Sequence, residues 1–329
     1  MENYLQTTRM NNREQKNEVK MTIKDIETKL SCKPSLYVMC GLSGSGKSAI
    51  AKEYQKKIPN CVIVSSDEIR EELCDGNRAD QSKNNEVFRI FHDRIRKNLE
   101  KYKSVIVDAT NITLKSRRAI LDKVNGLDIN KICLIVPKPY QQCLVDNKLR
   151  EWPVPDEVIE HQRRRFQIPY PEEGWTEIRI VGGFKDRPYE FDEMMEGYDQ
   201  KNPYHAFTLD VHCQLAADMF FDLKGYRQPW YTGALLHDVG KLFTQTIDEN
   251  GVAHYYNHEN VGAYEILSLK PNKEDIVGIC FLINYHMLPF SWNLNWSEPT
   301  RTMKRWQRRF GEEKYQMLLD FHECDLAMA

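Results

Sequence analysis

The sequence lacks several features that would place it in a familiar class at once. None of its nine cysteines forms a CxxC pair, which argues against a cysteine zinc site or a disulfide framework and favours reduced thiols in a cytoplasm. No apolar run approaches 18 residues, so we expect no membrane span. The polar N-terminus lacks the apolar core of a signal peptide. Lys and Arg number 46 against 48 Asp and Glu, so any nucleic-acid partner must be held by local basic patches.

What the sequence contains first is an alternation of short apolar runs with segments of helical spacing. The run at 35–40 is apolar and leads into a glycine loop, which is typical of a buried strand. The runs interpreted as strands lie at 35–40, 61–65, 104–108, 131–137 and 177–181. Strands that alternate with helices predict a parallel, doubly wound α/β sheet flanked by helices, with ligands at the carboxyl ends of its strands.

The pattern changes after residue 182. Residues 183–204 are polar and rich in turn formers, and beyond them the spacing is helical, with only 251–256 extended enough for a turn. We therefore expect a two-domain chain, which its length also favours. The expected parts are a polar extension at 1–34, an α/β domain at 35–182, a linker at 183–204 and an all-α domain at 205–329.

The glycine loop at 41–48, GLSGSGKS, fits the phosphate-binding pattern G-x-x-x-x-G-K-[ST] between a predicted strand and a predicted helix. Its glycines let backbone N–H groups curl around phosphates at a helix N-terminus. We expect Lys47 to reach the β- and γ-phosphates of ATP and Ser48 to bind Mg²⁺. The residues expected to hold the nucleotide are Gly41, Ser43, Gly44, Ser45, Gly46, Lys47 and Ser48.

Two acids follow predicted strands and should stand at the same edge of the sheet as the loop. Asp67 lies in SSDEIR and Asp108 in VIVDATN; one could steer Mg²⁺ while the other takes a proton from an acceptor hydroxyl, although each could instead cap a helix. Arg70 lies one helical turn beyond Asp67. The basic runs at 115–118 and 162–166 offer further cations or solvated helix faces.

These motifs together resemble the P-loop polynucleotide kinase family, which moves the γ-phosphate of ATP to a 5′-hydroxyl end. The resemblance covers about residues 35–180 and rests on GLSGSGKS, SSDEIR, VIVDATNITLKSRR and NKLR. It implies that Asp67 is the general base, that Arg70 contacts the acceptor's phosphate, and that Arg150 belongs to a lid over the transferring phosphate. It also places three residues near the metal and the acceptor, with the last two as alternatives for facing the acceptor: Asp108, Thr110 and Asn111.

Histidines gather in the helical part, where ALLHDVGKL sets His237 beside Asp238 among apolar residues. A lone buried histidine is usually a satisfied core residue, but here six residues of ligand type lie on separate helical segments. We expect one metal at His212, His237, Asp238 and Asp325 and a second at His258 and His286. Imidazoles with carboxylates suit Mn²⁺, Ni²⁺, Co²⁺, Fe or Zn²⁺. The remaining histidines of this part, expected to be structural or to face substrate, are His205, His254 and His322.

This arrangement resembles the HD superfamily of metal-dependent phosphohydrolases over residues 205–329, on ALLHDVGK, NHENVGA and the closing RRFGEEKYQMLLDFHECDLA. The resemblance implies that the four residues of the first set hold metal, which lowers the pKa of bound water from about 15.7 toward 7. Lys241 would contact the substrate phosphate, or else be a cation at a helix C-terminus.

A kinase and an HD phosphoesterase in one chain predict a bifunctional enzyme that heals nucleic-acid ends, with RNA favoured over DNA. The first site would phosphorylate a 5′-OH and the second would hydrolyse a 2′,3′-cyclic phosphate or a 2′- or 3′-phosphate. Two alternatives remain: a nucleotide or metabolite kinase fused to a nucleotidase, and an ATP-sensing regulator of an HD effector. The expected partners are RNA or DNA ends and ATP, without a membrane; the oligomeric state is not predicted.

Overall fold

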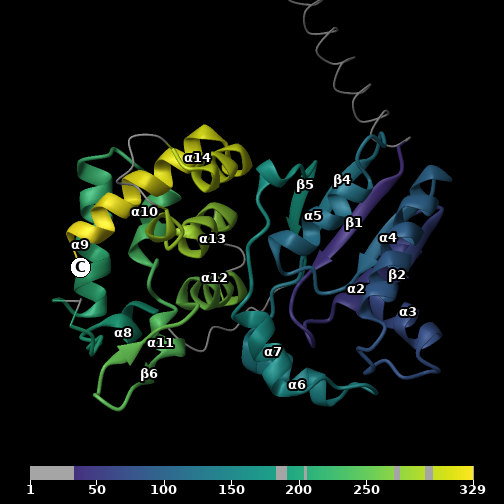
Figure 1. Ribbon diagram of the computed structural model, residues 1–329, viewed down its shortest axis with the longest axis horizontal. Coiled ribbons are helices and arrows are strands. Elements are labelled where there is room, and N and C mark those ends of the chain that lie inside the picture. The colour runs from purple at the N-terminus through teal and green to yellow at the C-terminus, as the bar shows by residue number, and fades with distance from the viewer. Residues whose placement is uncertain (1–32, 183–190, 204–205, 270–274, 293–298, 329) are drawn as a thin grey trace, which may run out of the picture.

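The fold is described from a computed structural model, which places residues 33–182, 191–203, 206–269, 275–292 and 299–328 (Figure 1). The predicted N-terminal extension, apart from its last two residues, lies outside the described residues, as do much of the predicted linker and His205. Figure 1 shows an α/β part, purple to teal, beside a helical part, green to yellow. In the described residues no helix is both long and apolar enough to cross a membrane.

The α/β part is built on a five-stranded sheet in the order β2-β3-β1-β4-β5, with every pairing parallel. Its strands are β1 (Ser35–Cys40), β2 (Cys61–Ser65), β3 (Ser104–Asp108), β4 (Asn130–Ile135) and β5 (Glu177–Ile180). The central strand β1 has almost no exposed residue, because a parallel sheet is covered on both faces and its inner strands are apolar runs. The predicted parallel α/β sheet is confirmed, with strand bounds within two residues of those expected.

Helices flank this sheet, and they begin where the sequence supplies a cap or a turn. They are α2 (Lys47–Lys57), α3 (Ser66–Leu73), α4 (Asn84–Glu100), α5 (Leu114–Lys123), α6 (Tyr140–Lys148), α7 (Asp156–Arg163) and the 3₁₀ turn η1 (Pro171–Glu173). Ser65 caps α3 by accepting from the N–H of Glu68, and Thr113 caps α5 by accepting from the N–H of Ser116. Neither Asp67 nor Asp108 is therefore an N-cap, which removes the structural alternative considered for both.

The second part is helical, as predicted, except for one small hairpin. Its helices are α8 (Phe191–Met195), α9 (Leu209–Asp222), α10 (Trp230–Leu235), α11 (Lys241–Thr244), α12 (His258–Leu269), α13 (Ile276–Tyr285), the 3₁₀ turn η2 (Pro289–Ser291) and α14 (Arg301–Ala327). The expectation of an all-α domain is wrong at β6 (Thr246–Ile247) and β7 (Ala253–His254), which pair antiparallel. The side chain of Asp248 accepts from the N–H groups of Asn250 and Val252 and so forms the turn.

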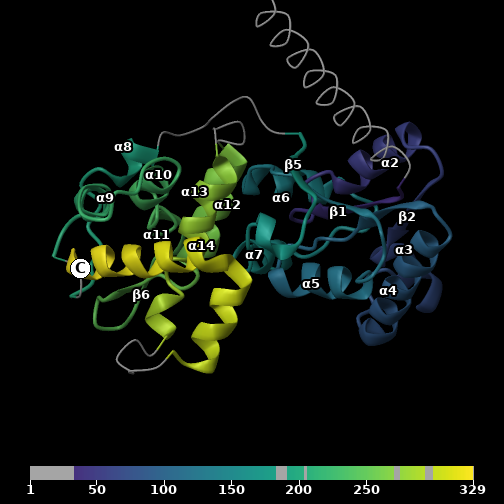
Figure 2. The same ribbon diagram turned by 90° about the horizontal axis from the view of Figure 1, so that it is seen from above.

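Two features of the helical part position its later side chains. Helix α14 bends at Gly311, whose backbone is not helical, so its two halves run in different directions (Figure 2). The segment ALLHDVGKL does not continue a helix as its spacing predicted: α10 ends at Leu235, α11 begins at Lys241, and His237 and Asp238 lie in the turn between them.

The two parts share one continuous apolar core rather than meeting only through a linker. Tyr170, after α7, packs edge-to-face against Phe281 of α13 and Phe310 of α14, with ring centroids 5.2 and 5.5 Å apart. The side-chain oxygen of Asn284 accepts from the backbone N–H of Ile168 at 2.6 Å. Hydrogen bonds within this core fix the relative position of the two parts, because a buried polar group without a partner lowers the stability of the fold.

Both basic runs of the α/β part supply a structural residue. Arg117 and Glu173 form a fully buried ion pair at 2.6 Å, and the guanidinium also donates to the backbone oxygens of Asn111 and Gln167. Arg163 pairs with Glu265 of α12 at 2.8 Å across the boundary between the parts. These two arginines are neither phosphate ligands nor solvated charges.

Candidate functional site

The loop at 41–48 joins β1 to α2, and its glycines are required by backbone geometry. Gly44 and Gly46 have φ of 82° and 95°, a region that favours glycine. A Cβ atom at Gly44 would lie 2.2 Å from the backbone oxygen of Cys143 in α6. Gly46 precedes the first helical residue of α2, Lys47. The loop thus has the conformation in which backbone N–H groups and a helix N-terminus face a phosphate.

Lys47 is buried within this loop. Its ammonium donates to the backbone oxygen of Leu42 at 2.6 Å and to the hydroxyl of Ser45 at 3.4 Å. Burial lowers the pKa of Lys47, and the negative charge of Asp108 partly counters that effect. An ammonium has three N–H groups, so these two bonds leave one for a phosphate oxygen.

Two residues that the sequence did not single out hold the loop in place. The side-chain amide of Gln162 accepts from the N–H of Ser43 at 2.8 Å and donates to the Ser43 hydroxyl at 3.0 Å. Lys138 donates to the backbone oxygen of Gly44 at 3.1 Å. Both come from segments more than 90 residues away in sequence, so only a tertiary structure could reveal them.

The structure brings together two residues predicted to act on the acceptor and one predicted to cover the transferring phosphate. Asp67, in the first turn of α3, lies 3.1 Å from the Arg70 guanidinium and 3.8 Å from that of Arg150, which follows α6. The Asp67 side chain is about half exposed, whereas Arg70 is buried and also donates to Asn84 at 2.8 Å. Part of Arg70 still lacks a partner, because its buried Nε has none in the described residues. A carboxylate open to solvent between two guanidinium groups can accept a proton next to a bound anion.

Asp108 ends β3, where it pairs in register with Ser65, the last residue of β2. Its charge acts on Lys47, so acid, lysine and loop meet at one edge of the sheet. The two residues after Ala109, Thr110 and Asn111, make different hydrogen bonds. Thr110 accepts from the N–H of Gly41 through its backbone oxygen. The side-chain amide of the buried Asn111 donates to the Met39 backbone at 2.9 Å.

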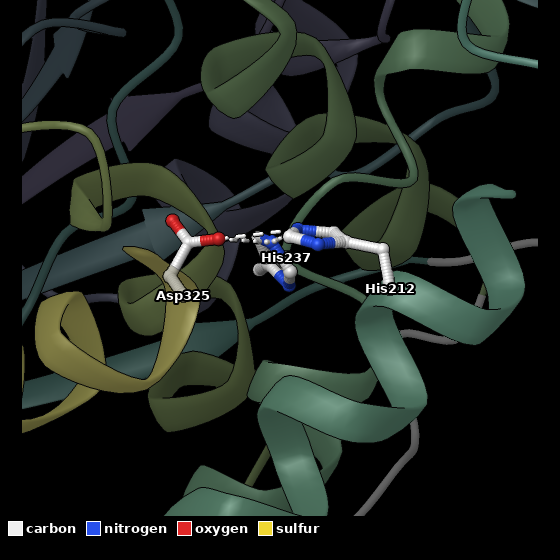
Figure 3. Close-up of side chains that lie close together, drawn as sticks. All are labelled: His212, His237 and Asp325. Carbon is white, nitrogen blue, oxygen red and sulfur yellow. Dashed lines mark hydrogen bonds and ion pairs between the residues drawn. The ribbon is translucent and has the colours of Figure 1, made fainter. Parts of the chain in front are cut away.

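The helical part contains a second cluster, formed by the six residues of ligand type that the sequence predicted. His212 of α9, His237 and Asp325 of α14 point toward one another (Figure 3), with the Nε2 atoms of the two histidines 3.2 Å apart. Their Nε2 atoms lie 3.1 and 3.4 Å from the same Asp325 oxygen. All three residues are buried. Their ligand atoms lie close enough to share one ion.

Asp238 connects this set to a second one. Its Oδ2 lies 3.5 Å from Nε2 of His212 and 3.3 Å from Nε2 of His237. Its Oδ1 lies 2.9 Å from Nε2 of His258 and 3.6 Å from Nε2 of His286. His258 begins α12 and His286 follows α13. One carboxylate therefore faces two ligand groups, one with each oxygen, which is the geometry of a bridge between two ions.

The hydrogen bonds of the four imidazoles fix which nitrogen is available. Nδ1 of each lies 2.8 or 2.9 Å from a backbone oxygen; the oxygens belong to Met328, Ala234, Tyr255 and Ile283. A carbonyl oxygen only accepts, so each Nδ1 carries the hydrogen and each neutral ring presents the lone pair of Nε2. In two pairs, His212–His237 and His258–His286, these atoms lie 3.2 and 3.3 Å apart. Lone pairs that close require a cation between them, either protons or metal ions.

Protons and metal ions compete for the first set. Burial lowers the pKa of His212, but its hydrogen bonds to Asp238 and Asp325 outweigh burial and raise that pKa to about 9. At His286 burial prevails and lowers the pKa. The carboxylates of Asp238 and Asp325 keep pKa values below their ordinary range, because neighbouring cations oppose the effect of burial. The donor set of neutral imidazole and ionised carboxylate fits a divalent transition metal.

Two glycines bring the two metal-ligand sets together. A Cβ atom at Gly240 would lie 1.9 Å from the backbone oxygen of His258, and one at Gly262 would lie 2.9 Å from the backbone nitrogen of Gly240. The turn at 236–240, which carries His237 and Asp238, therefore contacts the first turn of α12 backbone to backbone. This contact sets the distance from Asp238 to His258. The sequence signal was present, since each glycine follows a ligand at short spacing, but glycine alone does not reveal its partner.

Lys241 is buried beside the cluster and not at the end of a long helix. Its ammonium lies 2.6 Å from Oδ2 of Asp238 and donates to the side chain of Gln200 at 2.7 Å. It begins the short α11, so the alternative of a helix C-terminal cation does not apply. Of the remaining histidines, His254 pairs with Asp248 of the hairpin at 3.1 Å. His322 packs against Phe290, and its buried Nδ1 has no partner in the described residues.

Comparison with known proteins bears on the α/β part. Residues 36–169 match the family model described as an AAA domain. An L-seryl-tRNA(Sec) kinase of Methanococcus maripaludis is 28% identical over 145 residues, which make up 43% of this chain. The match spans 55% of that relative, about half its length. The family match, the loop and the sheet confirm the predicted P-loop α/β domain.

Solved structures give likenesses of fold. A chain of the Pnkp1/Rnl/Hen1 RNA repair complex matches with 20% identity and a TM-score of 0.36, covering 40% of this chain and 43% of that chain. Kti12 of Chaetomium thermophilum in complex with ADP-AlF3 matches with 17% identity and a TM-score of 0.39, covering 46% and 91%.

Proposed function

We propose that this protein heals nucleic-acid ends by two reactions, with RNA favoured over DNA as the substrate. The P-loop domain phosphorylates a 5′-hydroxyl with ATP. The helical part acts as an HD-type phosphohydrolase on a 2′,3′-cyclic phosphate or on a 2′- or 3′-phosphate. The observation that carries the proposal is the presence of two separate clusters in one continuous fold. One is an acid beside two arginines, of which Arg150 acts on Lys47 of the P-loop, and the other is a buried cluster of four imidazoles and two carboxylates.

In the kinase reaction, the half-exposed Asp67 takes the proton of the attacking hydroxyl. Arg70 holds the acceptor's phosphate, and Arg150 lies close enough to Asp67, at 3.8 Å, to reach the phosphoryl group in transfer. Lys47 and the loop N–H groups hold the β- and γ-phosphates. Ser48 and Asp108 would hold Mg²⁺, which would neutralise the charge that develops on the phosphate oxygens during transfer.

In the hydrolytic reaction, Asp238 bridges two ligand sets, His212–His237–Asp325 and His258–His286. Divalent metals bound there, such as Mn²⁺, Ni²⁺, Co²⁺ or Fe, would polarise a phosphate ester and acidify water. Lys241, held beside Asp238, adds a positive charge toward the substrate phosphate. The Nδ1 bonds to backbone oxygens orient the four rings before any ligand arrives.

One observation favours a second function, regulation of the HD centre by ATP. Lys138 donates to Gly44 of the P-loop, and its backbone oxygen accepts from the Tyr264 hydroxyl of α12 at 2.7 Å. The same helix begins with His258. A change in the P-loop on ATP binding thus has a short route to a metal ligand.

The proposal is tested with γ-labelled ATP and a 5′-OH RNA, with a 5′-OH DNA, nucleosides and seryl-tRNA as competing acceptors. We expect label on RNA. Lys47→Ala should abolish transfer and keep hydrolysis of a 2′,3′-cyclic-phosphate RNA, and Asp238→Ala should do the reverse. Label on nucleosides or seryl-tRNA with none on polymer ends would refute the end-healing assignment. If hydrolysis of the 2′,3′-cyclic-phosphate RNA requires ATP and no labelled product forms, the regulatory function is favoured.

A further inference from the structure

A cavity of about 490 Å³ lies at the junction of the two parts, away from both sites described above. Its walls come from α5 on one side and from the first half of α14 on the other, with Tyr170 between them. The charged residues on its walls are Arg118, Asp122, Glu172, Glu173, Arg305, Arg308 and Arg309.

The acids of this cavity do not neutralise its arginines. Glu173 is bound by the buried Arg117 through both oxygens, and Glu172 pairs with Lys314 at 2.5 Å. Only Asp122 remains. In the part of the chain that the structure describes, none of the four cavity arginines has a carboxylate within ion-pair distance.

Arg309 lacks a partner for one buried donor among the described residues and is repelled by two of the other cavity arginines. The buried Nε of Arg309 has no hydrogen-bond partner within the described ranges. Burial first, and then the charges of Arg118 and Arg305, lower the pKa of Arg309. Unpartnered donors and unbalanced positive charge in a cavity are both relieved by an anion. Guanidinium groups bind phosphate through two parallel hydrogen bonds, which favours phosphate over a spherical anion.

We propose that this cavity binds backbone phosphates of a nucleic-acid strand. The inference deepens the proposed function and rests on it for the identity of the ligand, because each wall of the cavity belongs to an element that leads along the chain to one of the two sites assigned to strand ends. Leu114 of its wall is six residues beyond Asp108, and α14 continues through the Gly311 bend from Arg309 to Asp325 (Figure 2). At 1.5 Å per residue, the helix from Arg309 to Asp325 spans at most about 24 Å.

The test is the binding of a 3′-fluorescein, 5′-OH single-stranded RNA of about a dozen nucleotides, followed by anisotropy without ATP over a range of salt. The variants are R305Q/R308Q, whose side chains are on exposed residues of α14, and R118Q from the opposite wall. Lys304→Gln is the matched control, because it removes one positive charge from the same turn of α14 outside the cavity. Thermal midpoints equal to that of the parent establish that each variant is folded.

We expect R305Q/R308Q to bind the RNA about tenfold more weakly and to lower the salt slope by about 1.4, since a single-strand contact contributes about 0.7. R118Q should show half of that change in slope, and Lys304→Gln should match the parent. Parent-like affinity and slope in both arginine variants would overturn the inference. So would weakened binding of ADP with unchanged RNA affinity, which would make the cavity a nucleotide site.

The inference and the proposed function fail separately. A parent protein that binds RNA through these arginines but phosphorylates no 5′-OH end refutes the kinase assignment and supports the strand site. A parent that phosphorylates RNA ends while the arginine variants bind RNA normally refutes the strand site alone.

Discussion

The contact between Gly240 and α12 leads to a prediction in which one of the two proposed metal ions is lost and the other is kept. In Gly240→Ala the new Cβ would lie 1.9 Å from the backbone oxygen of His258, whereas real contacts keep at least 3.0 Å. The turn at 236–240 and α12 must therefore separate by about 1.1 Å, the difference of those two distances. Overpacking of this kind costs about 1–3 kcal/mol of stability, so the protein still folds.

Metal binding is more sensitive than folding. His258 and Asp238 are 2.9 Å apart, and metal–ligand bonds of about 2.0–2.2 Å leave little tolerance for such a shift. We expect Gly240→Ala to keep the ion of His212, His237 and Asp325 and to lose the other. Hydrolysis of a 2′,3′-cyclic phosphate should fall about a hundredfold, the loss in rate that a 1 Å misplacement can cause.

The assay pairs metal analysis by mass spectrometry with hydrolysis of a 2′,3′-cyclic-phosphate RNA, read at its 3′ end. Gly251→Ala is the control: its φ of 78° also strains an alanine, but a Cβ there meets no atom within 4 Å and lies in the hairpin turn. It should lose comparable stability and keep both ions. Two ions per chain and parental hydrolysis in Gly240→Ala would refute the reasoning.

Three further predictions concern single groups. Asp67→Asn should lower 5′-phosphorylation by about 10²–10⁴-fold in a label-transfer assay, and near-parental turnover would exclude Asp67 as the base. Because the metal-free His212 has its pKa raised to about 9, it holds a proton at pH 7. Mn²⁺ binding should therefore release protons at pH 7, as calorimetry in buffers of different ionisation enthalpy would measure, and no release at pH 7 would contradict this. Glu173→Gln leaves Arg117 as an unpaired buried charge and should cost about 3–5 kcal/mol in urea unfolding, whereas a loss below about 1 kcal/mol would be inconsistent with that pair.

The sequence predicted the α/β fold well because its signals are local. A buried parallel strand is a short apolar run, and the loop at 41–48 has a spacing that admits few other structures. The same local logic was wrong at ALLHDVGKL, where helical spacing continues through a turn. The chain leaves the helix after Leu235, and Gly240 then lies against the backbone of α12, a tertiary contact that periodicity does not reveal.

The sequence predicted which histidines and aspartates gather in the second cluster, but it did not predict how they pair. Asp238 was expected in the first set alone, yet it faces both sets, because the turn that carries it lies between α9 and α12. Residues that position others escaped prediction altogether. Gln162 and Lys138 carry no motif and act only through contacts with residues distant in sequence.

The burial of Arg117 and Arg163 was also beyond the sequence. Both stand in basic runs that look like solvated surface or phosphate ligands, but their partners, Glu173 and Glu265, are 56 and 102 residues away. Periodicity indicates that one face of a helix is apolar. It does not indicate which arginine is buried in the core in an ion pair with a glutamate.

The most direct test of the account is one reaction on one RNA that carries a 5′-OH and a 2′,3′-cyclic phosphate, with ATP, Mg²⁺ and Mn²⁺. Both ends are read by mass spectrometry for the parent, Lys47→Ala and Asp238→Ala. We predict a 5′-phosphate and an opened or phosphate-free 3′ end with the parent, loss of only the 5′ change in Lys47→Ala, and loss of only the 3′ change in Asp238→Ala. An RNA left unchanged at both ends by the parent would contradict the account.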